Sequence, residues 1–227
     1  DGSYQDDLNS LFDGDGKLNA ELLDDLSAIR QTDGSGVDQG MHVNTIDLGG
    51  PGHVGAVNIN ESQAGALIDA GLHFAAADQV TLQANTSAGT HLHNSLKELT
   101  KLGVDAVSVS GVDTVSVDLG GLDAGDLGTG AGALHLPQFA AADGSDLTVT
   151  LDVANLGELN TAATLGGSLK DIGVDNVQIN LADAGKDGSY QDDLNSLFDG
   201  DGKLNAELLD DLSAIRQTDG SGVDQGM

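Results

Sequence analysis

Residues 1–41 of this chain recur, letter for letter, as residues 187–227. The sequence is therefore one period of 186 residues followed by the first 41 residues of the next period. Identity over that length indicates a tandem array, in which modules bury hydrophobic surface against their neighbours. Repeating a module increases reach and multivalency, whereas copying an active site increases only the amount of activity. The duplication thus favours a spacer or scaffold over an enzyme.

The chain is strongly acidic, with 37 Asp and Glu residues against 8 Lys and Arg residues and a formal net charge of -29. Asp accounts for 32 of these acids and Glu for 5. Asp is disfavoured in helix interiors and prefers caps, turns and oxygen-ligand sites for hard cations. The bias indicates surface chemistry linked to calcium or to high salt. Because a chain this acidic repels nucleic acid and anionic lipid, we expect neither as a partner.

Cysteine is absent, and no apolar run approaches the roughly 18 to 20 residues that cross a bilayer. The sequence therefore predicts no disulfides and no membrane insertion. Hydrophobic residues make up 39% of the chain, which is enough for a core. That core will be aliphatic, because aromatic residues make up only 3% and Trp is absent. Stacking platforms for sugars or bases are poorly supplied.

One phrase, Gly-Val-Asp, marks similar units along the chain. Following a helix-like stretch, it occurs at residues 36–38, 103–105 and 173–175, with the first instance recurring at 222–224. At the two central positions, leucines at helical spacing precede the phrase and an alternating aliphatic stretch follows it. Strand, helix, Gly-Val-Asp and strand form a βαβ unit with parallel strands, in which we expect the Asp to cap or to hydrogen-bond locally. The predicted fold class is α/β, with repeated βαβ-like units and a helical acidic block stacked into an elongated repeat architecture.

Local signals predict the ends of two helices. The leucine stripe before the second Gly-Val-Asp predicts a helix that begins at Thr90 as N-cap and ends at Gly103 as a left-handed C-cap. A second helix is predicted over residues 62–70, because Asn60 and Gln63 form a capping pair at its start.

The repeat divides the chain into three regions: the acidic helical block at 1–41, two βαβ-like units at 42–186, and the second copy of the block at 187–227. Each copy contains 10 acids and 2 bases, so the two copies hold 16 of the 29 net negative charges. If units pack through their neighbours, the two copies will have different partners. One copy is then left to contact another molecule end to end.

The strongest candidate site is the run Asp-Gly-Asp-Gly-Lys-Leu-Asn at residues 13–19, which recurs at residues 199–205. It resembles the calcium loop of EF-hands and, more closely, of dockerin modules. The resemblance implies calcium ligands at Asp13, Asp15 and Asn19 and, in the second copy, at Asp199, Asp201 and Asn205. The run departs from the family pattern at the first and twelfth loop positions, where Leu11 and Leu22 replace carboxylate ligands. An Asp/Gly turn that caps the following helix is the alternative.

Two weaker motifs have simpler alternatives. Residues 33–38 match part of the calcium-binding nonapeptide of RTX proteins, but a single copy cannot build a β-roll, so a helix-to-strand turn is favoured. His91 and His93 flank Leu92. Zinc needs three or four ligands, and no Asp or Glu lies within a few residues of this pair, so polar residues at a helix start are favoured over a zinc site.

Motifs for nucleophilic, zinc-protease and phosphate chemistry are absent, so the chain is not expected to be an enzyme. The acidic, Cys-free, Asp/Gly-rich repeat resembles the tandem-repeat region of giant secreted bacterial surface or adhesin-like proteins. The resemblance implies an extracellular spacer or fibre-forming scaffold of the cell surface or biofilm matrix, stiffened by calcium. Its partners would be adjacent repeats of the same or a neighbouring chain, arranged head to tail. The alternative is a calcium-dependent binding module for a matrix polymer or a neighbouring chain.

Overall fold

The computed structural model describes residues 4–24, 44–49, 53–85, 91–127, 134–179, 197–204, 206 and 208, which form an α/β fold with parallel sheets. In chain order the elements are α1 (Tyr4–Asn9), β1 (Thr45–Ile46), β2 (Ala56–Asn60), α3 (Glu61–Asp69), β3 (His73–Phe74), β4 (Gln79–Asn85), α4 (Leu96–Leu102), β5 (Ala106–Ser110), β6 (Thr114–Asp118), α5 (Ala124–Leu127), β7 (Gln138–Ala141), β8 (Thr148–Val153), α6 (Leu156–Asp171) and β9 (Val174–Ile179).

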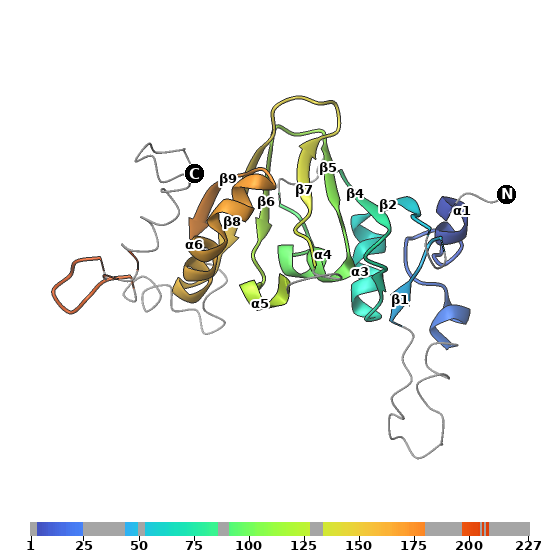
Figure 1. Cartoon of the computed structure of the whole chain (residues 1–227), viewed down its shortest axis with the longest axis horizontal. Helices are drawn as coiled ribbons and strands as arrows, with labels where there is room; N and C mark the ends of the chain where they lie inside the picture. Colours follow the sequence, from blue (N-terminus) through green and yellow to red (C-terminus); the bar gives the residue numbers. More distant parts are fainter. Residues whose placement is uncertain are drawn as a thin grey trace, which may run out of the picture.

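The strands form two larger sheets and a short pair, and neighbouring strands are parallel throughout. One sheet has the order β2-β4-β5-β7, the second has the order β6-β8-β9, and β1 pairs with β3. β5 and β6 follow one another across the Gly111 turn, where φ is 85°, yet they belong to different sheets. Along the chain α1 lies beside β2 at one end of the fold, and β9 and α6 lie at the other (Figure 1).

Two βαβ units occur where the sequence predicts them. The connection β4-α4-β5 joins parallel strands of the first sheet, and β8-α6-β9 joins parallel strands of the second. Gly103 ends α4 in the left-handed conformation, with φ 85°, as expected. The capping box at the start of α3 is also confirmed, because the Asn60 side chain accepts from the Gln63 backbone and the Gln63 side chain accepts from the Asn60 backbone.

The predicted start of the helix that ends at Gly103 is wrong. α4 begins at Leu96 after a capping box between Ser95 and Glu98, and Thr90 lies outside the described residues. Leu92 does not belong to the helix: its N–H donates to the Ser116 carbonyl at 2.9 Å, beside β6, and its side chain is buried. Leu92 therefore has helical spacing in the sequence, but its backbone pairs with the neighbouring strand β6.

The Asp of Gly-Val-Asp has a different role from the local one expected. Asp105 Oδ2 accepts a hydrogen bond of 2.8 Å from the backbone N–H of Val80, which begins the neighbouring strand's buried stretch. Asp175 Oδ2 accepts from the Val149 N–H in the same way, also at 2.8 Å. The phrase thus joins each strand to the preceding parallel strand across about 25 residues of chain. The copies at 36–38 and 222–224 lie outside the described residues.

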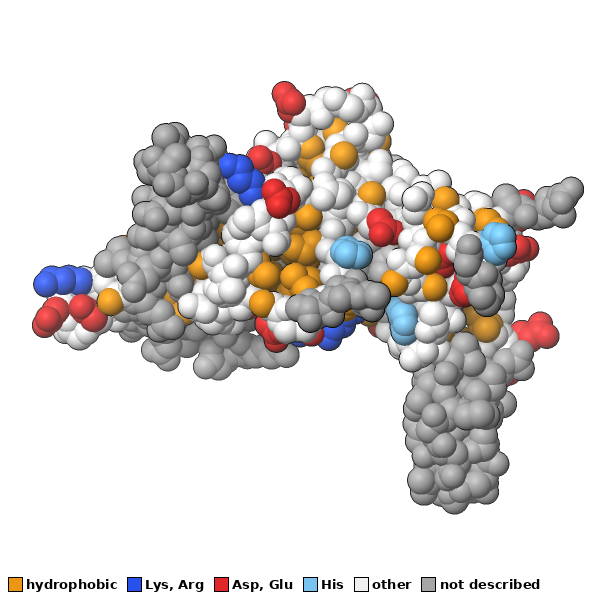
Figure 2. All heavy atoms as spheres, in the orientation of Figure 1, with side chains coloured by type: hydrophobic (Ala, Val, Ile, Leu, Met, Phe, Trp, Pro, Cys, Tyr) orange, Lys and Arg blue, Asp and Glu red, His pale blue; other side chains and the backbone are white. Residues whose placement is uncertain are grey.

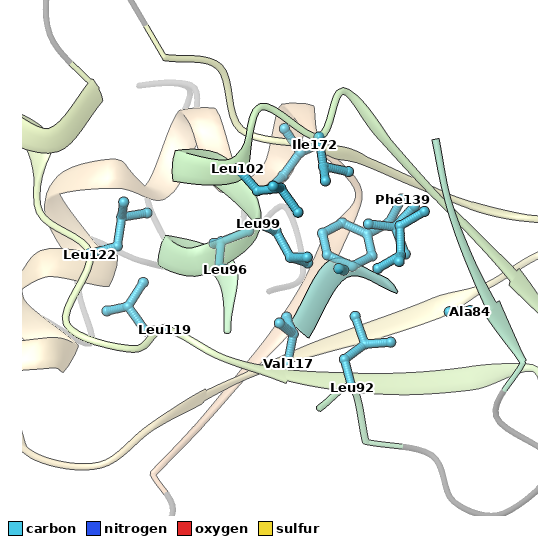
Figure 3. Packing of buried hydrophobic residues seen from close by; sticks show 14 of the residues in the cluster. Ala84, Leu92, Leu96, Leu99, Leu102, Val117, Leu119, Leu122, Phe139 and Ile172 are labelled. Atoms are coloured by element: carbon cyan, nitrogen blue, oxygen red, sulfur yellow. The ribbon is translucent and has the colours of Figure 1, made fainter. Parts of the chain in front are cut away.

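The core is aliphatic, as the composition predicts. α4 contributes Leu96, Leu99 and Leu102, all at most 1% exposed, to the same cluster of buried side chains as Phe139 (Figure 3). Burying aliphatic side chains of this size stabilises a fold by roughly 1.5 to 3 kcal/mol each before the loss of chain entropy is counted. Within the ranges described, no helix is both long enough and apolar enough to cross a bilayer.

Candidate functional site

The Asp-rich loop of the first block forms a tight turn stabilised by its own side chains. Asp13 Oδ1 accepts from the backbone N–H groups of Asp15 and Lys17, at 2.9 and 3.0 Å. Gly16 adopts φ 78°, the left-handed conformation that a glycine at the turn allows. Asn19 Oδ1 accepts from the Leu22 N–H at 2.8 Å, so it caps the helical segment that begins at residue 20.

The second copy of the loop forms the same turn. Asp199 Oδ1 accepts from the backbone N–H groups of Asp201 and Lys203, at 2.9 and 3.0 Å, and Gly202 adopts φ 75°. Asn205 lies outside the described residues. These hydrogen bonds are those of an Asp/Gly turn that precedes a helix. Calcium binding at Asp13, Asp15, Asn19, Asp199, Asp201 and Asn205 stays a prediction.

The first acidic block covers the edge strand of the larger sheet. β2 has β4 on one side, and on its other side the Gln5 side chain of α1 lies beside Asn58. Gln5 Nε2 donates to the Asn58 carbonyl at 2.8 Å, and Gln5 Oε1 accepts from the Asn58 N–H at 2.7 Å. One amide side chain therefore satisfies both backbone groups of Asn58, as a further strand would. Covering an edge in this way prevents uncontrolled pairing with other chains.

Hydrophobic contacts accompany this seal. Leu8 of α1 is 2% exposed and Leu18, after the Asp-rich turn, is 6% exposed. Both belong to the same cluster of buried side chains as Val57 and Ile59 of β2. A cleft of about 1090 Å³ runs between the Asp13 loop and α3, with Glu61 and His93 in its lining. The block thus has a preferred docking place, defined by a hydrogen-bonded edge and a hydrophobic contact.

A separate group of side chains gathers on the second sheet. His91, Asp118 and Asp152 each offer a possible metal-binding atom, and these atoms all lie within 4.8 Å of one another. His91 Nε2 is 3.2 Å from Asp118 Oδ2, and His91 Nδ1 is 3.4 Å from Asp152 Oδ2 and 2.7 Å from Ser116 Oγ. The side chains of His91 and Asp118 are about half exposed, whereas that of Asp152 is 6% exposed.

Strand register explains why these residues meet. Asp118 and Asp152 are directly paired on the parallel strands β6 and β8, so both side chains lie on one face of the sheet. His91 forms an isolated parallel bridge with Ser116, two residues before Asp118. The sequence signal was weak, since no carboxylate lies near His91 along the chain. Strand pairing brings Asp118 and Asp152, which lie 27 and 61 positions further along the chain, next to His91.

The two histidines of the His-Leu-His run have different surroundings. His93 is 84% exposed at its side chain and contacts only one carboxylate in the described fold, Glu61, with Nδ1 2.5 Å from Glu61 Oε2. It therefore lies near a single acid, whereas His91 lies between two. Comparisons with protein families, with curated proteins and with solved structures find no match to this chain.

Proposed function

We propose that this chain is a structural tandem repeat of a large extracellular bacterial surface, matrix or adhesin-like protein, which acts as a spacer or fibre-forming scaffold. The observation that carries the proposal is the docking of residues 4–24, the described part of the first block, on the edge of β2 through Gln5 and Leu8, together with the exact recurrence of the block's sequence at residues 187–227. In this proposal the block is the junction between consecutive periods.

A continued array would repeat the contact between the block and β2 at every period. In a continued array, the block at 187–227 precedes the next copy of residues 42–186 in the same way that residues 1–41 precede this one. The same side chains would then meet the same kind of edge strand. Each period would be sealed by the block before it, and the parallel sheets would follow one another as an elongated stack, because neighbour contacts carry the stability of such arrays.

Composition supports the extracellular part of the proposal. The absence of cysteine and the abundance of Asp and Gly are typical of secreted bacterial repeat proteins. Acidic side chains are spread over the face shown in Figure 2 and do not gather in one patch. A net charge of -29 keeps neighbouring copies soluble and opposes unspecific association. Junction contacts would then have to be specific to hold the array together.

A chain with one more unit tests the proposal. The longer chain consists of residues 1–227 followed by a second copy of residues 42–186. Because the natural sequence has no cysteine, a single Leu204→Cys change places one thiol in the second block. We expect this thiol to react quickly with an alkylating reagent in the 227-residue chain, where Leu204 is 39% exposed, and at least tenfold more slowly in the longer chain.

Leu18→Cys is the matched control, since Leu18 is buried and its thiol should react slowly in both chains. Small-angle X-ray scattering gives the second readout. A rigid junction adds a fixed length to the maximum dimension of the longer chain. Equal reactivity of the Leu204→Cys thiol in both chains, with scattering from two bodies at variable distance, would contradict the proposal.

A further inference from the structure

We propose that His91, Asp118 and Asp152 form a site for a divalent transition-metal cation of the zinc type. This site lies on β6 and β8 and plays no part in the junction at β2. One imidazole and two carboxylates are a nitrogen and oxygen ligand set that zinc accepts, with a fourth position left for water or another ligand.

The charges of the two carboxylates favour a bound cation. Asp118 and Asp152 are paired directly across neighbouring strands, and like charges in that relation repel each other. The Asp152 side chain is 6% exposed, and water therefore solvates its charge poorly. A cation between the two carboxylates would offset their repulsion and add a further partner for the buried charge of Asp152. Half-exposed His91 and Asp118 leave an entry path for the ion.

The spacing of the donor atoms can be compared with that of a tetrahedral zinc site. Zinc bonds of about 2.0 to 2.1 Å in a tetrahedron place ligand atoms roughly 3.3 Å apart. The 3.2 Å between His91 Nε2 and Asp118 Oδ2 fits that spacing. The donor atoms of all three residues lie within 4.8 Å of one another, so rotation of the Asp152 side chain toward Nε2 of His91 closes the remaining gap while His91 keeps its position. Asp118 and Asp152 lie on paired strands, and His91 is joined to β6 by its bridge with Ser116, so the backbone on both sides of the site is held in place.

A contact with Ser116 orients the ring of His91. A histidine that binds a metal through one ring nitrogen usually donates the N–H of the other to a fixed acceptor, which orients the ring. Ser116 Oγ lies 2.7 Å from His91 Nδ1 and can accept that hydrogen bond. Nε2, beside Asp118, is then the ligand atom. Ser116 is therefore assigned as a positioning residue for the site.

Imidazole also separates this site from the calcium prediction for the Asp-rich loops. Calcium takes six to eight oxygen ligands, whereas nitrogen ligands favour zinc and its neighbours. We therefore expect the site to prefer Zn²⁺ over Ca²⁺. Since the chain has no cysteine, thiolates cannot compete for the added metal.

Calorimetric titration of the whole chain with Zn²⁺ at neutral pH is the test. We expect one tight site, unaffected by millimolar Ca²⁺. His91→Gln or Asp152→Asn should weaken that site at least 100-fold, and Ser116→Ala should weaken it about 10-fold, as losses of such supporting contacts do. His93→Gln is the matched control and should leave the site unchanged, because His93 lies beside Glu61 alone among the carboxylates of the described fold.

Substituted Co²⁺ gives an independent readout, because a tetrahedral nitrogen and oxygen site produces visible absorption bands that His91→Gln should abolish. Ser116→Ala keeps all three ligands, so it remains informative if a ligand variant fails to fold. Three results would overturn the proposal: no zinc binding tighter than millimolar, a tight site that survives His91→Gln, or equal losses from His91→Gln and His93→Gln.

Discussion

The two copies of the acidic block have one sequence and two environments. Their Asp-rich turns are the same, with hydrogen bonds to Asp13 and to Asp199 of equal length and a left-handed glycine in each. Their hydrophobic side chains differ. Leu18 is 6% exposed, whereas its counterpart Leu204 is 39% exposed. The turn is therefore a local property, and burial is a property of what the block meets.

The difference is more than one docked copy and one free copy. Phe12 is partly buried and Phe198 is 42% exposed, in line with the leucines. Leu208 shows the reverse, since it is 2% exposed while its counterpart Leu22 is only partly buried. Each copy therefore buries a different part of its surface. A junction that accepts a new neighbour would exchange one set of contacts for the other.

The largest expected difference concerns the leucines that follow the turns. Leu18→Ala should lower the free energy of unfolding by about 2 to 4 kcal/mol, because it leaves a cavity beneath a buried side chain. Leu204→Ala should lower it by less than about 1 kcal/mol, because that side chain already meets solvent. Urea denaturation followed by circular dichroism measures both. Equal effects would show that the two copies share one environment.

Removing the edge seal should have a smaller effect. Gln5→Ala leaves the Asn58 N–H and carbonyl to water, and we expect a loss of about 1 kcal/mol in the free energy of unfolding. The open β2 edge should also promote association, which light scattering at increasing protein concentration will detect. Gln5→Glu is the control, because it keeps the acceptor for the Asn58 N–H and adds a charge that discourages strand pairing.

The turns themselves should respond alike. Asp13→Ala and Asp199→Ala each remove one acceptor of two backbone hydrogen bonds, so each should cost about 1 kcal/mol in local stability. If calcium binds these loops, it should raise the melting temperature by about 10 °C, and each variant should remove part of that rise. Magnesium and sodium chloride serve as controls for charge screening. A difference between the variants would show that the turn is not purely local.

The smallest expected effect lies outside both blocks. Lys97 Nζ lies 3.1 Å from Asp126 Oδ2. This hydrogen bond is the main reason that the pKa of Asp126 lies below its ordinary value of 3.8, and a hydrogen bond from the Asp123 backbone is the next. A depressed carboxyl pKa stabilises the fold above the unfolded value and loses that effect as the pH falls through the folded value. Because Asp126 is partly exposed, we expect Lys97→Gln to cost about 0.5 kcal/mol or less at neutral pH.

The same variant tests where acid sensitivity lies. The difference between Lys97→Gln and the natural chain should shrink as the pH falls below about 4, since protonated Asp126 gains nothing from the lysine. Denaturation at several pH values measures this. A difference that persists at low pH would assign the effect of Lys97 to its hydrogen bond with the Gly121 carbonyl and to packing. Neither result would alter the comparison of the two blocks, so the ion pair between Lys97 and Asp126 is a useful reference.

Local rules predicted much of the fold. The capping pair of Asn60 and Gln63 and the left-handed Gly103 could be read from the sequence because each depends on a few neighbouring residues. The parallel βαβ units could be read from the order strand, helix, strand along the chain. The start of α4 could not be read, because Leu92 has helical spacing but pairs with β6. Spacing alone does not reveal a competing strand.

The candidate sites divide along the same line. The turn at Asp13 was foreseen as one of two alternatives, because an Asp/Gly run forms hydrogen bonds within itself. The group of His91, Asp118 and Asp152 was not foreseen, because it depends on the register between β6 and β8. Register is set by which faces of the strands are buried, and this requires the whole sheet.

By itself the sequence determined the repeat, the charge, the Asp/Gly turns and the caps at Asn60 and Gly103, since each follows from composition or from contacts between residues a few positions apart. The order of strands and helices along the chain also indicated the parallel units. The tertiary structure alone decided which copy of the block covers β2, why Leu18 and Leu204 differ, and where His91 meets its two carboxylates. Those outcomes depend on the burial of side chains against distant segments. Two identical sequences can therefore have different environments.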